Sequence, residues 1–220
     1  MRERMAMQLG ERFDIKYETM PWHHCDSVVF DIGGILIYYA PDEFVKKIFP
    51  DDLALQDHML QHVYHGKYWP MFDRGTMEYE EAAEKLSREF GYPAKEYMRA
   101  MTEWFELKSP IEEGWRAVSR CKRSGMRLFL LSNYPERGFQ RLLERFDERF
   151  RIFDGGVISC KVHLLKPEPG IYRLLTDRYS LDPRRTLFID DIEENVNAAT
   201  REGIHGFHKT KQGAMDTFFV

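Results

Sequence analysis

Three short apolar runs in this chain each end in a small polar group, and this pattern constrains the fold more than any other feature. The runs cover residues 27–30, 127–131 and 186–189. A polar side chain follows each of them: Asp31, Ser132 and Asp190. Continuous apolar runs of this length are typical of parallel strands that are buried on both faces. Because parallel strands end at the same edge of a sheet, we expect these polar side chains to share one crevice.

The apolar periodicity divides the chain into a leader, a core and an inserted cap. Residues 1–26 form a polar leader, and helices are predicted over residues 43–49, 53–65, 77–90 and 94–107. From Ile111 onward helical and strand patterns alternate, which is typical of a parallel sheet built from βαβ units. We therefore predict an α/β fold: a doubly wound, Rossmann-like parallel sheet from residues 27–36 and 111–220, with a helical cap, residues 37–110, inserted after its first strand.

Charge and apolar content argue against several classes of protein. The 220 residues carry a net charge of −4 from 32 basic and 36 acidic side chains that are well mixed, so we expect neither nucleic acid nor a membrane surface as a partner. No window approaches the roughly 18 apolar residues of a membrane-spanning helix, and no secretion signal is visible. Three cysteines without metal-ligand spacing indicate thiols in a reducing compartment. We expect a cytoplasmic protein, either a monomer or a homodimer.

Asp31 is the first candidate for chemistry. It follows a buried strand pattern directly, and Gly33 and Gly34 after it allow a tight turn and a close approach of the backbone to a ligand. A carboxylate in this place can attack phosphorus and form an aspartyl-phosphate. The alternative is that Asp31 only caps a turn, which is a common use of aspartate.

Ser132, Asn133 and Lys166 are candidates for holding an anion. The hydroxyl of Ser132 and the amide of Asn133 can donate hydrogen bonds to phosphate oxygens, although the pair could equally cap the helix that begins after Pro135. Lys166 stands before Pro167 in an otherwise apolar turn, where its charge can neutralise a transferring phosphoryl group. Its alternative is an ordinary solvated lysine.

Asp190 and Asp191 are candidates for binding a divalent cation. Adjacent acids at the end of an apolar run repel each other unless a cation or hydrogen-bond donors compensate. Magnesium binds through one or two carboxylates, so Asp31 and this pair could hold it together. Asn195 could steady the loop through a side-chain hydrogen bond. The alternative is an acidic cap for the helix that follows.

The chain resembles the haloacid dehalogenase superfamily of hydrolases in four segments that occur in this order: FDIGG, LSN, KPEPGIY and FIDDIEEN. The resemblance spans residues 27–208. Within the superfamily the chain is most similar to phosphatases related to the bacterial alpha-D-glucose-1-phosphate phosphatase, which have a helical C1-type cap; the phrase FDRG at residues 72–75 carries this finer similarity. The resemblance implies a magnesium-dependent phosphatase that acts on a small phosphorylated metabolite, for example a sugar phosphate.

The resemblance also implies a role for each candidate residue. Asp31 would be the nucleophile, and Lys166 would orient both nucleophile and phosphate. Ser132 and Asn133, with the backbone at Gly34, would hold the phosphoryl group. Magnesium would be bound by Asp31, the carbonyl of Gly33, Asp190 and Asp191, with Asp191 the better candidate of the adjacent pair and Asn195 in support.

One position departs from the pattern of the family. Phosphatases that resemble this chain usually carry a second aspartate two residues after the nucleophile, where it acts as general acid and then as base, and this chain has Gly33 there. The loss of such help typically lowers a rate by about 10² to 10⁴. The glycine therefore favours substrates with good leaving groups, and it leaves the proton donor unidentified.

Two other functions remain open, and the cap adds candidates for substrate contact. A 2-haloacid dehalogenase would use the same aspartate and no metal, but it gives no reason for two adjacent acids. A phosphate-binding regulatory protein would have lost turnover through Gly33. Aromatic and histidine side chains of the cap or its approach could reach the substrate, although packing or surface roles are expected for most of them: Tyr38, Tyr39, His62, Tyr64, His65, Tyr68 and Trp69.

Overall fold

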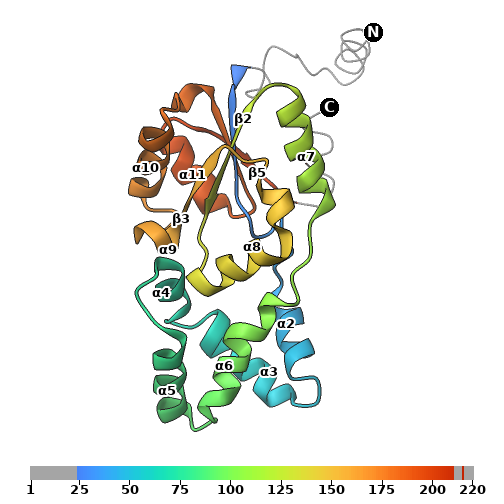
Figure 1. Ribbon diagram of the computed structural model, residues 1–220. Helices are drawn as coiled ribbons and strands as arrows, with labels where there is room; N and C mark the ends of the chain where they lie inside the picture. Colours follow the sequence, from blue (N-terminus) through green and yellow to red (C-terminus); the bar gives the residue numbers. More distant parts are fainter. Residues whose placement is uncertain (1–23, 211–214, 216–220) are drawn as a thin grey trace.

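The computed structural model describes residues 24–210 and residue 215, which form a parallel sheet with a group of helices beyond one end of its strands (Figure 1). The leader expected over residues 1–26 therefore lies almost entirely outside the described residues. Within the described ranges, no helix is both long and apolar enough to cross a membrane.

The described part of the sheet has the strand order β3-β2-β1-β4-β5, and every neighbouring pair is parallel. The strands are β1 (Ser27–Phe30), β2 (Arg127–Ser132), β3 (Gly155–Ile158), β4 (Thr186–Asp190) and β5 (His205–His208). The order runs outward in both directions from β1, so it reverses between β1 and β4. In such sheets ligands bind outside the carboxyl ends of the strands at this reversal point. The predicted doubly wound α/β fold is confirmed.

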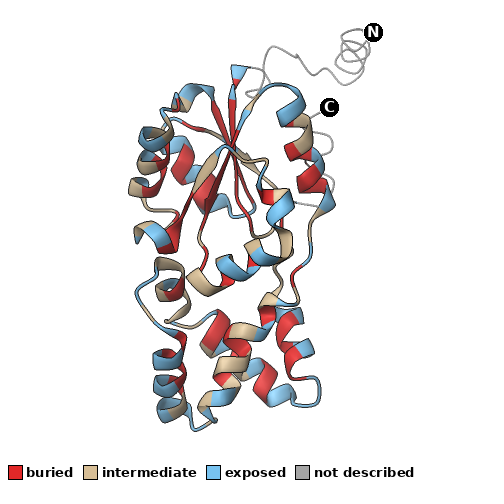
Figure 2. Cartoon of the chain, in the orientation of Figure 1, coloured by how far each residue is buried: buried red, intermediate tan, exposed pale blue. Residues whose placement is uncertain are grey.

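Helices cover both faces of the sheet because alternate strand side chains point to opposite sides. On one face Val29 and Phe188 pack against α10 (Pro169–Tyr179) and α11 (Glu193–Arg201). On the other face Val28 and Phe30 pack against α7 (Glu112–Arg123) and α8 (Glu136–Phe150). The three central strands, β1, β2 and β4, are buried along almost their whole length, whereas the helices expose their outer sides (Figure 2). Burial on both faces explains why the strands read as continuous apolar runs.

The helices between residues 41 and 105 lie beyond the carboxyl ends of the strands (Figure 1). They are α2 (Pro41–Ile48), α3 (Leu53–Met59) with a π-helical continuation (Leu60–Tyr64), α4 (Trp69–Arg74), α5 (Tyr79–Phe90) and α6 (Ala94–Thr102) with a 3₁₀ turn (Glu103–Phe105). The sequence predicted four helices here, and α4 was missed. Pro70 stands in the gap between the helices predicted over residues 53–65 and 77–90, yet it occupies the first turn of α4, where a proline costs no hydrogen bond.

The two segments that join these helices to the sheet lie side by side. The backbone N–H of Tyr38 donates to the carbonyl of Ser109 at 2.8 Å, and Ile111 donates to Leu36 at 2.8 Å. Apolar side chains of the helical group and of the sheet also belong to one continuous core, for example Trp104 and Phe30. The division into a core and a cap at residues 37–110, and motion of the cap about these segments, stay predictions.

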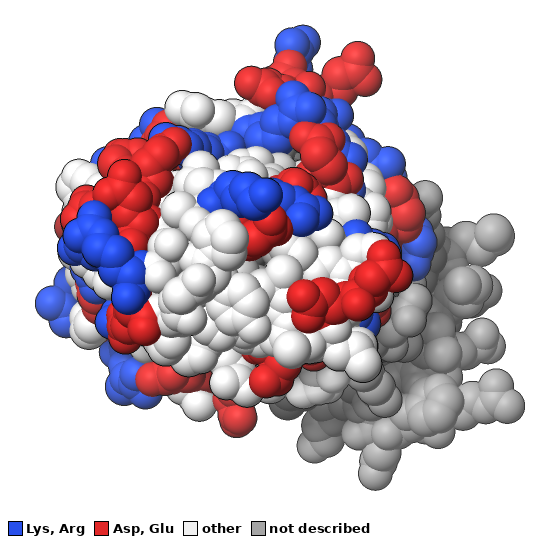
Figure 3. All heavy atoms as spheres, turned by 90° about the horizontal axis from the view of Figure 1, so that it is seen from below, with Lys and Arg blue, Asp and Glu red and all other residues white. Residues whose placement is uncertain are grey.

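Charged side chains of both signs are interspersed on the face seen in Figure 3, around a largely uncharged centre. This face shows no basic stripe of the kind that binds nucleic acid. The cysteines Cys25, Cys121 and Cys160 are buried and form no disulfide, in agreement with the expectation of thiols.

Candidate active site

Three of the predicted residues meet where the strand order reverses. Asp31 directly follows β1, Asp190 is the last residue of β4, and Lys166 comes from the loop between α9 (Ser159–Val162) and α10. The Lys166 Nζ lies 3.0 Å from Asp31 Oδ1 and 2.6 Å from Asp190 Oδ2. The side chain of Lys166 is only 1% exposed, so it is not the solvated lysine that the sequence left open.

Burial controls the electrostatics of this cluster. It raises the pKa of Asp31 to about 7, with Lys166 opposing the shift and Asp190 adding to it. Burial also disfavours the charge of Lys166, but Asp190 and Asp31 outweigh it, so the pKa of the lysine is raised. One lysine thus faces more negative charge than it can balance, and the cluster favours a further cation.

Asp190 is held in place from several sides. Asn195 Nδ2 donates to both of its carboxylate oxygens, at 3.2 and 3.1 Å, and the backbone N–H of Ile192 donates to Oδ1 at 2.8 Å. Asn195 therefore supports the loop through Asp190. The helix that follows, α11, has Ile192 as its N-cap residue and receives no side-chain cap, so neither acid caps it by a hydrogen bond of that kind, and a favourable effect of the acids on the helix terminus stays a prediction.

The carboxylate oxygens of Asp31, Asp190 and Asp191 offer a site for a metal ion. One oxygen from each lies within 4.8 Å of the others. Partial burial raises the pKa of Asp191, and the charge of Asp190 beside it raises it further. Magnesium prefers such hard oxygen ligands, so the donor set fits this ion.

Gly34 makes room for the carboxylate of Asp191. Its φ is +67°, and a Cβ on it would lie 1.9 Å from Asp191 Oδ2. Only glycine satisfies both conditions, the left-handed backbone and the close approach. The roles predicted for Gly33 and Gly34 in binding magnesium and phosphate stay predictions.

The amide of Asn133 shapes the loop that carries Lys166. Its Nδ2 donates to the carbonyl of Lys166 at 2.9 Å, and its Oδ1 accepts from the Lys166 N–H at 2.8 Å. Ser132 hydrogen-bonds Asp31 and lowers its pKa. Neither caps α8, which begins without a side-chain cap, so that alternative is wrong. Asp31 does accept a bond from the N–H of Ile32 at 2.7 Å, as a turn-capping aspartate would.

A cavity of about 260 Å³ opens onto Asp31, Ser132 and Lys166. Four aromatic side chains contribute to its walls: Tyr39, Trp69, Trp104 and Tyr134. Tyr39 and Trp69 were candidates from the sequence. Trp104 and Tyr134 were missed because a single aromatic residue carries no local signal of the cavity that it lines. The other aromatic and histidine candidates from the sequence do not line this cavity. Tyr64, for example, is buried and donates to the carbonyl of Ala100 at 2.7 Å.

Two charged residues in the cavity wall, Asp73 and Lys108, were also missed as site residues. The Lys108 Nζ lies 4.1 Å from the centre of the Trp104 ring, and the rings of Tyr39 and Tyr134 are 4.8 and 4.9 Å away. Burial lowers the pKa of this lysine well below its usual range, although Asp73 opposes the shift. Asp73 stands inside the FDRG phrase, which was the available signal for it.

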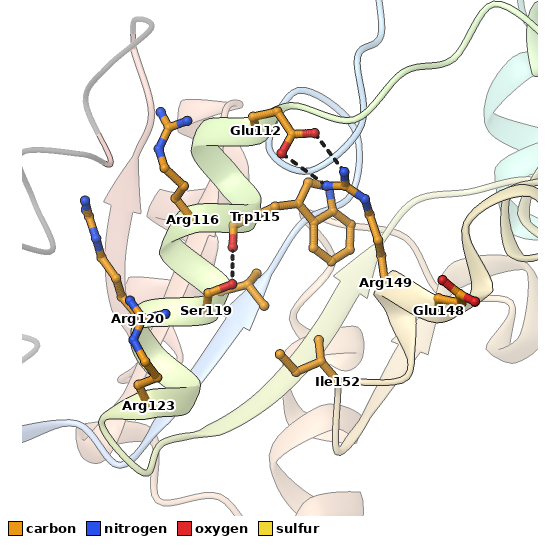
Figure 4. A pocket seen from close by; sticks show the side chains of 10 residues that line it. Glu112, Trp115, Arg116, Ser119, Arg120, Arg123, Glu148, Arg149 and Ile152 are labelled. Carbon is orange, nitrogen blue, oxygen red and sulfur yellow. Dashed lines mark hydrogen bonds and ion pairs between the residues drawn. The ribbon is translucent and has the colours of Figure 1, made fainter.

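A larger hollow, of about 540 Å³, lies between α7 and α8 and is shown in Figure 4. Arginines and a tryptophan line it, and Arg149 pairs with Glu112 across it at 2.9 Å. It receives no residue from the carboxyl ends of the strands. We therefore place the candidate site in the smaller cavity, where the titratable cluster is.

Comparison with known proteins shows which enzymes the chain resembles. The chain is 26% identical over 184 residues to the sesquiterpene phosphatase astK of Aspergillus oryzae, covering 84% of this chain and 89% of the relative. It is 25% identical to a phosphorylated carbohydrates phosphatase of Thermotoga maritima, covering 81% and 82%. The fold matches a HAD family enzyme of Bacteroides thetaiotaomicron, solved as a magnesium complex, with a TM-score of 0.68 at 21% identity, over 88% of this chain and 98% of that one.

The family itself is established by a match over most of the chain. Residues 25–203 match the model of the haloacid dehalogenase-like hydrolases. The matched range contains all four segments on which the resemblance rested, while the similarity to the glucose-1-phosphate subgroup stays an expectation. The chain therefore belongs to the haloacid dehalogenase-like hydrolase family.

Proposed function

We propose that this protein, a phosphoric monoester hydrolase of its family, is a magnesium-dependent phosphatase that acts on a small phosphate monoester through an aspartyl-phosphate on Asp31. One observation carries the proposal: Asp31 lies at the end of β1 against Lys166, with two further carboxylates beside it. A nucleophile, a cation and a hard-metal donor set are the groups that phosphoryl transfer requires. Relatives named as phosphatases over most of the chain support the same reaction.

Each residue of the site would contribute a defined part of the reaction. A carboxylate oxygen of Asp31 attacks phosphorus, and the charge of Lys166 beside it stabilises the negative phosphoryl oxygens. Asp190 and Asn195 keep Lys166 in place, and Asn133 fixes the backbone of its loop. A magnesium ion bound by Asp31, Asp190 and Asp191 would neutralise further negative charge.

The cavity indicates what kind of organic group the ester carries. Four aromatic rings line the cavity onto which Asp31 opens, and the volume of about 260 Å³ limits the group to a small one. Rings of this kind pack against apolar chains and against the apolar faces of sugars. We infer a small phosphorylated metabolite with an apolar or ring-shaped part; a cytoplasmic location and a monomeric or homodimeric state stay predictions.

The two other functions considered from the sequence are less well supported. A 2-haloacid dehalogenase displaces halide without a metal, and it has no use for Asp191 beside Asp31. A regulatory phosphate-binding protein would not turn over. Release of inorganic phosphate from a panel of sugar, alkyl and aryl phosphates, with magnesium and with chelator, separates the phosphatase from the other two, and release of halide from a 2-haloacid would identify the dehalogenase. Magnesium-dependent release supports the phosphatase, and binding of phosphate without release would favour the regulatory protein.

Magnesium should stabilise the protein more strongly at pH 8 than at pH 6. The pKa values of Asp31 and Asp191 are raised, to about 7 for Asp31, so protons compete with the metal as the pH falls through this range. The shift in Tm on adding magnesium should therefore be larger at pH 8 and should largely disappear in Asp191→Asn. An equal shift at both pH values, or an unchanged shift in the variant, would argue against this metal site.

Gly34→Ala should impair both activity and stability. A Cβ there collides with Asp191 and the backbone is left-handed, so we expect a loss of about 1–3 kcal/mol in unfolding free energy and a weaker response to magnesium. Gly91→Ala is a matched control, since Gly91 has a φ of +86° with open space around its Cβ position. Gly91→Ala should lose roughly 1 kcal/mol in unfolding free energy and keep full activity. Equal activity in the two variants would count against the role of Gly34.

A further inference from the structure

Asp73 places an unused carboxyl group in the wall of the candidate site. It lies in the last turn of α4 and lines the same cavity as Asp31. Its Oδ1 is buried and has no hydrogen-bond partner among the described residues. A buried polar atom without a partner costs about 1–3 kcal/mol, and native structures hold only a few such atoms. Stability alone therefore does not explain this side chain.

The backbone around Asp73 is fixed to α9 and to the loop that follows α9. Ser159 Oγ donates to the carbonyl of Asp73. The next residue, Arg74, forms an ion pair with Glu168 and donates to the carbonyl of His163 at 2.9 Å. These contacts hold the end of α4 against the loop that carries Lys166. The position of Asp73 relative to the reacting groups is thus determined by direct contacts.

The surroundings keep the carboxyl of Asp73 able to exchange a proton near neutral pH. Burial raises its pKa to about 7, Lys108 and Lys166 oppose the shift, and Asp31 adds to it. The charged groups that shift its pKa are Asp31, Lys108 and Lys166. The charge of Asp73 in turn raises the pKa of four titratable groups around it: Tyr39, Tyr79, Tyr134 and Cys160. A general acid is most effective when its pKa lies close to the working pH.

We propose that Asp73 is a catalytic residue: it protonates the leaving oxygen of the phosphate ester and supplies the acid–base function for which Gly33 has no side chain. The inference rests on the proposed phosphatase function. As Asp31 bonds to phosphorus, the bond from phosphorus to the ester oxygen breaks, and that oxygen takes the proton of Asp73 to leave as an alcohol. The Asp73 carboxylate then accepts a proton from the water that hydrolyses the aspartyl-phosphate, which releases inorganic phosphate and restores both acids.

The test compares two esters in single turnover, so that only transfer to Asp31 is measured. An alkyl phosphate needs a proton on its leaving oxygen, whereas p-nitrophenyl phosphate does not. We expect Asp73→Asn to slow the alkyl ester by about 10²–10³-fold and the aryl ester by less than about tenfold. Asp73→Glu should recover part of the alkyl rate. Asp57→Asn, which changes an exposed aspartate of α3, should leave both rates unchanged.

The pH profile and two further outcomes complete the test. With the alkyl ester, the wild-type rate should fall as pH rises above about 7, and Asp73→Asn should lose this limb while keeping its fold by circular dichroism. Equal loss for both esters, or a ratio altered by Lys108→Met and not by Asp73→Asn, would overturn the role of Asp73 while leaving the phosphatase intact. A wild-type protein that releases phosphate from neither ester would overturn both proposals.

Discussion

Asp31→Asn should lower magnesium-dependent phosphate release on the order of 10⁴-fold or more, a size typical of the loss of a catalytic nucleophile. The amide keeps the shape of the carboxylate but cannot form a stable acyl phosphate. The measurement is phosphate release at saturating substrate, together with trapping of the phosphorylated protein by rapid quench. The wild type should yield a labelled protein and the variant should not.

The same substitution should not destabilise the protein. The folded pKa of Asp31 is raised to about 7, so its charged form is disfavoured in the folded state at higher pH. At pH 8 the neutral amide removes this cost, and we expect an equal or higher Tm for Asp31→Asn; below about pH 4, where the aspartate is neutral in both states, the difference should vanish.

A variant that keeps more than a tenth of the wild-type activity would contradict the nucleophile assignment.

Lys166→Met should have the largest effect on stability of any single substitution in the site. The lysine is buried between Asp31 and Asp190, and its removal leaves two acids without their cation. Breaking a buried ion pair from one side costs about 3–5 kcal/mol. Activity should fall as well, because the transferring phosphoryl group loses a positive charge. Urea unfolding at pH 8 measures the first effect.

The loss of stability in Lys166→Met should be larger at high pH than at low pH. Without Lys166 the folded pKa of Asp31, which burial already raises, rises further, so this acid takes up a proton as the pH falls and the destabilisation shrinks with the loss of its charge. The difference in unfolding free energy between the wild type and Lys166→Met should therefore be largest near pH 8 and become smaller toward pH 5. Lys161→Met, at an exposed lysine paired with Glu136, should lose less than about 1 kcal/mol at either pH. A gap for Lys166→Met that is independent of pH would contradict the ion-pair explanation.

The sheet and the main site residues could be predicted because their signals are local. Each buried strand is a continuous apolar run, and Asp31 and Asp190 occupy the positions at or just after strand ends. The helix α4 was missed because a proline permits both a break and a helix start, and contacts along the chain do not distinguish them. In the structure this segment forms the helix α4, which packs against α9.

The sequence by itself determined the alternation of strands and helices that builds the sheet, the chemistry at the strand ends and the family, since these depend on short segments and their succession. Only the tertiary structure decided that Asp190, and not Asp191, binds Lys166, because adjacent side chains point in different directions and packing selects which is buried. It also brought Asp73 and Lys108 to the cavity of Asp31. Such contacts join residues far apart in the chain, and their energy exists only once the chain has closed around them.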